Sequence, residues 1–110
     1  IFYLNLREAN TIVKSDFKFV EDAAKAVLEL GAKSALITNG RQKACYMSGE
    51  TTITATPPKV RVRRLTGAGD ALMAAHIASQ FLAEDPYESL TFSLKEASKF
   101  ISEEFNYVAN

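Results

Sequence analysis

The sequence predicts an α/β fold with a mostly parallel sheet flanked by helices, and three observations carry this prediction. Short apolar segments alternate with longer segments in which apolar residues recur at helical spacing. Glycine or Asn-Gly follows several of these segments, where such residues end helices or turn the chain. The order strand, helix, strand, hairpin, strand, helix, helix is typical of layered α/β domains. Because the strands are few, we expect these 110 residues to be one piece of a larger sheet.

Five strands are expected, each a short run rich in apolar or β-branched residues and bounded by turn residues. They cover residues 1–4, 34–38, 43–47, 51–56 and 60–64. The third and fourth flank Ser48-Gly49-Glu50, which predicts a β-hairpin. In the fifth, valines alternate with basic residues, the pattern of a half-exposed strand.

Four helices are expected, the first of them preceded by a turn and the second marked by apolar residues at helical spacing. They cover residues 5–14, from 15 or 16 to about 30, 70–81, and 86 to about 105. Ser15 or Asp16 can cap the second helix, and Gly31 ends it. The third helix contains almost only small or apolar residues, so we expect it to be largely buried.

Composition and charge narrow the classes of function. Lys plus Arg and Asp plus Glu both number 13, and this balance gives no support for broad binding to nucleic acid or an anionic membrane. No apolar run reaches the roughly 20 residues that span a bilayer, and the start of the chain lacks the pattern of a signal peptide. Cys45 is the single cysteine, which excludes an internal disulfide and fits a cytoplasmic location.

The strongest chemical signal is the run Thr66-Gly67-Ala68-Gly69-Asp70, between an expected strand and an expected helix. Glycine lets a ligand approach the main chain, and the first amides of a helix point outward at the positive end of the helix dipole. Such a turn can bind phosphate. A carboxylate beside bound phosphate makes sense if it accepts the proton of an attacking hydroxyl, which predicts phosphoryl transfer. The alternative is a purely structural turn in which Asp70 is a helix N-terminal charge.

This run, followed by its small and apolar helix, closely resembles the second signature of the PfkB, or ribokinase-like, sugar and nucleoside kinases. Two upstream features match that family in order and spacing. Asn5-Leu6-Arg7-Glu8 resembles its N-x-x-E motif, and Thr38-Asn39-Gly40 resembles its nucleotide-approaching loop. The resemblance covers most of this chain but only the final part of the family's chain. It implies that residues 1–110 are the C-terminal nucleotide-binding portion of a three-layer ribokinase-like domain, without the N-terminal substrate and lid part.

The resemblance implies a catalytic role for the glycine turn. Asp70 would be the general base that activates the substrate hydroxyl. Gly67, Ala68 and Gly69 would supply a backbone anion hole for the moving phosphoryl group. The implied activity of the parent protein is ATP-dependent phosphorylation of a sugar or nucleoside hydroxyl, whereas the 110 residues alone are expected to have little or no activity.

The resemblance also implies ATP and Mg²⁺ as cofactors. The residues expected near ATP are Thr38, Asn39, Gly40 and Thr66. Asn5 and Glu8 would act on Mg²⁺ through water, since magnesium keeps several of its waters. The expected partners are ATP and a small-molecule substrate, with no nucleic acid and no membrane. For the full-length parent, a homodimer is one possible oligomeric state.

Three details qualify the resemblance. The segments Leu6–Ala9 and Leu65–Ala74 look most like pseudouridine kinases, which favours a pseudouridine-like substrate. Arg64-Leu65 replaces the Asp-Thr pair usual in the family, which puts a monovalent-cation site in doubt. Lys43 stands where the family often has a second glycine, and it is either a phosphate-reaching residue or a solvated strand residue.

Two other functions stay open. The chain is alternatively a noncatalytic nucleotide-binding domain, from a degenerate or truncated kinase, or an unrelated α/β domain whose glycine turn is structural only.

Several further residues have a structural and a functional interpretation. His76 is either a core or surface residue or a neighbour of the adenine, and Cys45 is expected to pack rather than react. The arginines of residues 61–64 either meet phosphate or form a solvated strand edge.

Overall fold

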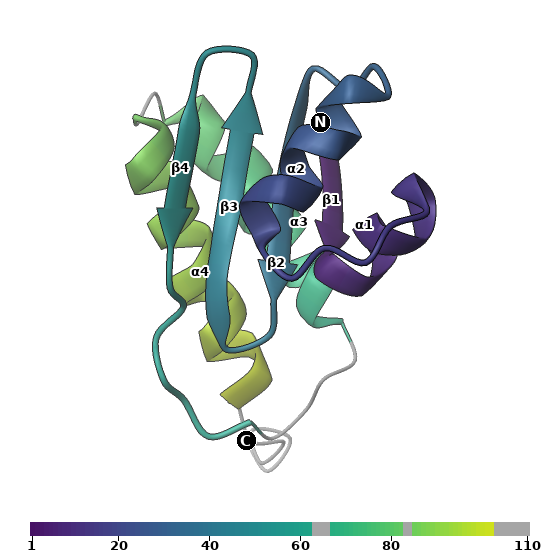
Figure 1. Cartoon of the computed structure of the whole chain (residues 1–110). Helices are drawn as coiled ribbons and strands as arrows, with labels where there is room; N and C mark the ends of the chain where they lie inside the picture. Colours follow the sequence, from purple (N-terminus) through teal and green to yellow (C-terminus); the bar gives the residue numbers. More distant parts are fainter. Residues whose placement is uncertain (63–66, 83–84, 103–110) are drawn as a thin grey trace, which may run out of the picture.

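A four-stranded sheet with the order β1-β2-β3-β4 forms the middle of the computed structural model, which describes residues 1–62, 67–82 and 85–102 (Figure 1). The strands are β1 (Phe2–Asn5), β2 (Ser34–Asn39), β3 (Gln42–Ser48) and β4 (Thr52–Ala55). β1 and β2 are parallel, whereas β2–β3 and β3–β4 are antiparallel. The sheet is therefore mixed rather than mostly parallel, because short turns that reverse the chain join the last three strands.

Helices cover both faces of the sheet, so the expected α/β fold with three layers and a β-hairpin is confirmed. α1 (Leu6–Val13) and α2 (Val20–Glu29) lie on one face, and α3 (Ala68–Phe81) and α4 (Pro86–Ser102) lie on the other (Figure 1). Among the residues described, no helix is long and apolar enough to cross a membrane.

Side chains that alternate along the strands build a separate core on each face. Ile37 faces α1 and α2, in a cluster with Val20, Ala24 and Val27 of α2. Its neighbour Leu36 faces α3 and α4, in a cluster completed by Ala44, Leu72, Leu90 and Leu94. Leu36 and Ile37 are both fully buried, and each contributes about 1.5–3 kcal/mol by leaving water. β2 therefore holds the two helical layers together.

α2 begins at Val20, later than the cap at Ser15 or Asp16 that the sequence suggests. The Asn10 side chain explains this difference, because it forms hydrogen bonds with both the N–H and the C=O of Phe17. Asn10 Oδ1 accepts from Phe17 N at 2.9 Å, and Asn10 Nδ2 donates to Phe17 O at 3.0 Å. These bonds hold the connection between α1 and α2 out of the helix, and Phe19 then precedes the first turn in an extended conformation.

Residues 60–62 are not in a strand, contrary to the alternation of valine and basic residues in the sequence, and residues 63–64 lie outside the described part. The preceding Pro57-Pro58 helps to end β4 at Ala55, and residues 60–62 beyond it are not paired with a neighbouring strand. Proline has no N–H to donate to a neighbouring strand, and it also restricts the residue before it. The segment instead leaves the end of β4 and passes along the bottom of the sheet (Figure 1).

α3 is only partly buried, although its sequence is small and apolar nearly throughout. Leu72, His76 and Ser79 are buried against the sheet and α4. Met73, Ile77 and Phe81 lie on the outer side and are 37%, 43% and 84% exposed. A helix that is apolar all round has no preferred face in its sequence, so packing decides which side is covered.

Candidate active site

The motif residues gather at one end of the sheet. β1 and β2 run in the same direction, so their carboxyl ends meet at one edge, next to the β2–β3 turn and the start of α3 (Figure 1). In open α/β sheets, ligands bind outside the carboxyl ends of the strands. The topology therefore brings the described parts of the three motifs, which are far apart in the sequence, to the same edge of the sheet.

A cavity of about 500 Å³ opens beside the start of α3. This volume falls within the range of small-molecule sites, roughly 300–1,000 Å³. Four expected site residues line it: Thr38, Gly40, Ala68 and Gly69. The other walls are mostly apolar and come from the β2–β3 turn, β3, the 57–62 segment, α3 and α4; they are Arg41, Gln42, Ala44, Pro57, Pro58, Val60, Val62, Leu72, Leu94, Ala97, Ser98 and Ile101.

The sequence did not identify these other walls as part of a site. Val60 and Val62 formed part of an expected strand, and Leu94 and Ala97 fall on the apolar side of a helix. Nothing in the sequence distinguishes a side chain that lines a cavity from one that fills a core. The Pro57-Pro58 pair was the available signal, because it breaks the strand pattern and directs the following residues over the cavity.

Gly67 forms the turn at the start of α3, where its φ is +89°. A side chain there would be strained, and an added Cβ would lie 3.1 Å from Cζ of Phe100 in α4. Ala71 N donates to Gly67 O at 2.9 Å, which makes Gly67 the residue before the first turn. The amides of Ala68, Gly69 and Asp70 belong to that first turn, whose N–H groups have no partner within the helix and can bind an anion. Asp70 itself is exposed.

The three residues of the Thr38-Asn39-Gly40 loop face two different hollows. Thr38 and Gly40 line the apolar cavity, whereas Asn39 lines a second, more open hollow together with Arg7 and Asn10. This separation follows from the strand, in which neighbouring side chains point to opposite faces. Thr66, the fourth residue expected near ATP, lies outside the described residues.

Asn5 and Glu8 form a capping box at the start of α1. Asn5 Oδ1 accepts from Glu8 N at 2.8 Å, and Glu8 Oε1 accepts from Asn5 N at 2.9 Å. Within the described ranges, no group of three or more His, Cys, Asp or Glu residues could hold a metal. The capping bond uses Oε1 of Glu8, so Oε2 is the oxygen that can face an ion. One carboxylate oxygen fits a hydrated Mg²⁺ that is held mainly by a polyphosphate, and it does not fit a direct protein cage.

Lys43 lies on the sheet face that carries α2, away from the apolar cavity. Its Nζ is 2.6 Å from Oε2 of Glu21, the second residue of α2. This bond is the largest cause of a lowered pKa of Glu21. Lys43 is therefore a partly exposed strand residue that pairs with Glu21, and it does not line the cavity. Cys45 is buried on the same face, and burial raises the pKa of its thiol to about 11, as expected for a packing residue that does not react.

His76 packs against the sheet and does not line the cavity. It is 2% exposed, and its Nδ1 lies 2.8 Å from the hydroxyl of Tyr3 in β1. The Tyr46 ring of β3 also lies close, with a centroid distance of 5.6 Å. Burial lowers the pKa of His76 and is the largest cause of a raised pKa of Tyr3. Of the two roles considered for this histidine, the structure shows the core residue.

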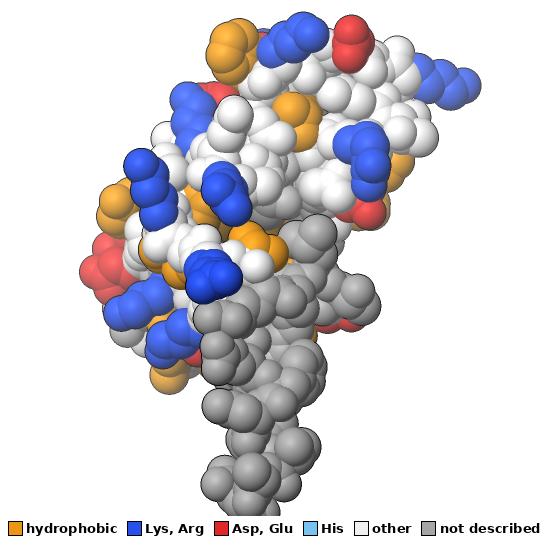
Figure 2. Space-filling model, turned by 90° about the horizontal axis from the view of Figure 1, so that it is seen from below, with side chains coloured by type: hydrophobic (Ala, Val, Ile, Leu, Met, Phe, Trp, Pro, Cys, Tyr) orange, Lys and Arg blue, Asp and Glu red, His pale blue; other side chains and the backbone are white. Residues whose placement is uncertain are grey.

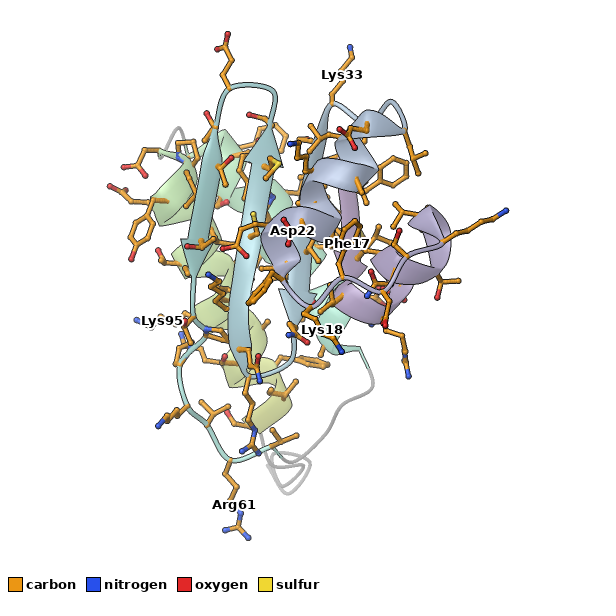
Figure 3. The ribbon with its side chains drawn as sticks, viewed as in Figure 1. Phe17, Lys18, Asp22, Lys33, Arg61 and Lys95 are labelled. Atoms are coloured by element: carbon orange, nitrogen blue, oxygen red, sulfur yellow. The ribbon has the colours of Figure 1, made fainter. Side chains whose placement is uncertain are left out.

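Basic side chains surround the cavity end of the molecule. Figure 2 views this end and shows several Lys and Arg side chains, with Asp and Glu side chains between them, over its described part. Arg41 lines the cavity, and Arg61 and Lys18 extend from the same end in Figure 3. Arg63 and Arg64 lie outside the described residues. This end thus carries several basic side chains, although the whole chain is neutral.

A family model described as pfkB family carbohydrate kinase matches residues 1–104. The chain belongs to this family. The family assignment and the ribokinase-like fold expected from the three motifs are thus confirmed. No curated protein sequence matches the chain significantly.

Solved structures support the same fold. A structure from Escherichia coli assigned as ribokinase II, in complex with ATP and Mg²⁺, is 25% identical to this chain with a TM-score of 0.78. The aligned part covers 94% of this chain and 33% of that one. Ribokinase from Thermotoga maritima is 24% identical, with a TM-score of 0.80 and coverages of 93% and 36%. Phosphofructokinase-2 of Escherichia coli, solved with substrates and products, is also 24% identical, with a TM-score of 0.80 and coverages of 91% and 34%. The pfkB family chain described here therefore spans about a third of the length of these structures.

Replacing Gly67 by Ala should destabilise the fold by about 1–3 kcal/mol, because the new side chain meets both a positive φ and Phe100. Gly69→Ala is the matched control two residues later. The structure has open space there, and alanine is favoured over glycine within a helix by about 1 kcal/mol. Urea unfolding monitored by circular dichroism measures both changes. Equal midpoints for the two variants would contradict this account of the turn.

Acidification should destabilise the chain through His76, its single histidine. Because the pKa of His76 in the folded chain lies below the ordinary 6.5, the unfolded chain takes up this proton first as the pH falls. The stability is present above pH 6.5 and is lost as the pH falls through the lowered folded-state pKa. Urea unfolding between about pH 7 and pH 5 measures this loss, and His76→Gln should flatten the slope. An unchanged slope in that variant would exclude His76 as its source.

Proposed function

We propose that the protein containing this chain is an ATP-dependent kinase that phosphorylates a hydroxyl of a sugar or nucleoside, with a pseudouridine-like substrate favoured. One observation carries the proposal: Ala68 and Gly69 belong both to the anion-binding turn and to the wall of the apolar cavity. A single ligand can thus place an apolar base in the cavity and its phosphates at the amides of the turn. ATP combines these two chemical features.

The cavity supports a nucleotide rather than pyrophosphate as the phosphoryl donor. One structure of the ribokinase family, 21% identical to this chain, is described as a pyrophosphate-dependent kinase, so the fold itself admits both donors. Pyrophosphate has no apolar part, whereas most residues lining the cavity of about 500 Å³ are apolar. An apolar cavity of this size favours a donor with a base to bury.

In the proposed mechanism, Asp70 accepts the proton of the substrate hydroxyl while that oxygen attacks the γ-phosphorus of ATP. The bond from the γ-phosphorus to the bridging oxygen breaks, and ADP leaves. The amides of the proposed anion hole, Gly67, Ala68 and Gly69, together with the neighbouring amide of Asp70, stabilise the negative charge on the transferred group. Mg²⁺, when bound, neutralises charge on the polyphosphate, and Glu8 with Asn5 would hold it through water.

Asp70 is well placed for this role, because its side chain is exposed at the first turn of α3 and the cavity wall includes the residue before it. The acceptor hydroxyl would come from a site that this chain does not supply. The solved relatives are about three times as long, and we assign most of the acceptor pocket to the remaining part of the kinase. The isolated chain would then bind nucleotide without turnover.

Asp70→Asn in the complete kinase should lower kcat by about 10²–10⁴-fold, since it removes the base and keeps the shape of the side chain. Asp22→Asn is the matched control, because Asp22 is also exposed in a first helical turn but belongs to α2, on the other face (Figure 3). Steady-state kinetics with ATP and pseudouridine, then with a panel of sugars and nucleosides, measures both. The KM for ATP should change little. Full kcat in Asp70→Asn would reject Asp70 as the base.

The 110 residues alone should bind ATP while showing no measurable transfer to pseudouridine. NMR titration of the isolated chain should shift the amides of Gly67, Gly69 and Asp70, and a coupled ADP assay should stay at background. Shifts elsewhere without any at this turn would favour a purely structural glycine turn. Turnover by the isolated chain would show that the acceptor site lies within it.

A further inference from the structure

α3 carries the proposed catalytic turn, so the contacts that locate this helix on the sheet also locate the turn. Two of its side chains, one helical turn apart, are buried toward the sheet: Leu72 and His76. Leu72 packs in the apolar cluster around Leu36 and Leu90. Apolar contacts are not directional, so this cluster holds the helix against the sheet but specifies its axial position less sharply than a directional contact does.

The contact between His76 and Tyr3 is directional. The hydroxyl of Tyr3 and Nδ1 of His76 are 2.8 Å apart, and their rings meet edge to face at 74° with centroids 5.5 Å apart. Across residues 1–62, 67–82 and 85–102, this is the only side-chain hydrogen bond that joins α3 to the sheet. A hydrogen bond keeps its strength only within a few tenths of an ångström, so it can define the axial position of the helix.

The two partners belong to the two elements that carry the proposed chemistry. Tyr3 lies two residues before Asn5, about 7 Å along β1. His76 lies six residues after Asp70, about 9 Å along α3. The contact is therefore too far from the turn to touch substrate, and yet it joins the strand that ends at Asn5 to the helix that begins beside Asp70.

We propose that the Tyr3–His76 hydrogen bond is a positioning contact that sets the catalytic turn of α3 against the carboxyl end of β1. This inference rests on the proposed kinase function. The outer side of α3, with Met73 and Ile77, is exposed in this chain, so contacts with α4 and with the sheet locate the helix, and the Tyr3–His76 bond is the directional contact that reaches β1. A displacement of about 1 Å at a reacting group can cost 10²-fold in rate. Loss of the Tyr3–His76 hydrogen bond, six residues from Asp70 along α3, would allow such a displacement of the turn.

Tyr3→Phe is the decisive variant, because it removes the hydroxyl and keeps the ring. Its matched control is Tyr46→Phe, which removes a hydroxyl from the other ring beside His76 and leaves the Tyr3–His76 bond intact. In the complete kinase, Tyr3→Phe should lower kcat about tenfold while the KM for ATP stays within about twofold. Tyr46→Phe should leave both values near those of the parent.

A merely structural role predicts a different result. Tyr3→Phe would then lower activity only in proportion to the folded protein lost, and kcat per active site, determined by titration, would stay unchanged. Rescue provides a second test. Asparagine places an amide oxygen near the position of Nδ1, so His76→Asn should keep more of kcat than His76→Leu. Equal kcat per active site in all these variants would overturn the proposal.

A spectroscopic measurement separates this inference from the kinase assignment. The chain has a single histidine, so one imidazole gives one set of ¹⁵N signals without ambiguity. In the 110-residue chain, Tyr3→Phe should shift the His76 Nδ1 signal and the amides of Gly67, Gly69 and Asp70, and Tyr46→Phe should leave these three amides in place. If the complete kinase phosphorylates no acceptor, the proposed function fails. The amide shifts still test whether the Tyr3–His76 hydrogen bond positions the turn. Unchanged amide signals in Tyr3→Phe would reject the positioning role of the Tyr3–His76 hydrogen bond, even if the complete kinase is active.

Discussion

The alternation of side chains along β2 is the constraint on which the rest of this structure depends. Leu36 and Ile37 are neighbours in the chain, and both are fully buried on opposite faces of the sheet. This strand can therefore exist only with a helical layer on each side. The same alternation continues past the core to the carboxyl end, where it turns Thr38 toward the apolar cavity and Asn39 toward the second hollow.

The site combines elements that are individually ordinary. A glycine with positive φ, a capping box and an apolar cavity each occur in proteins without catalytic activity. Their meaning comes from their shared location at one end of a parallel strand pair and from the membership of the chain in the pfkB family. Gly67 shows how closely structure and site are linked here, because the backbone that exposes the helix amides also packs against Phe100 of α4.

Most of the fold could be predicted, and the differences have local causes. Strand and helix patterns located the hairpin and all four helices, because apolar periodicity is set by the residues themselves. The start of α2 was missed because Asn10 binds Phe17, a contact that depends on how two segments meet. The valines before residue 63 suggested a strand, but a strand needs a neighbour, and the structure gives residues 60–62 none. The apolar walls of the cavity were missed for a related reason, since an apolar side chain looks the same in a core and in a pocket.

By itself, the sequence determined the order of the elements, the glycine turn before α3 and the motifs that indicate the pfkB family, because these depend on residue types at fixed spacing. Only the tertiary structure decided which partners those residues have. It joined Lys43 of β3 to Glu21 of α2, and His76 of α3 to Tyr3 of β1. Each of these depends on the distance between atoms of particular side chains. Such distances are set by the packing of whole elements rather than by any local pattern.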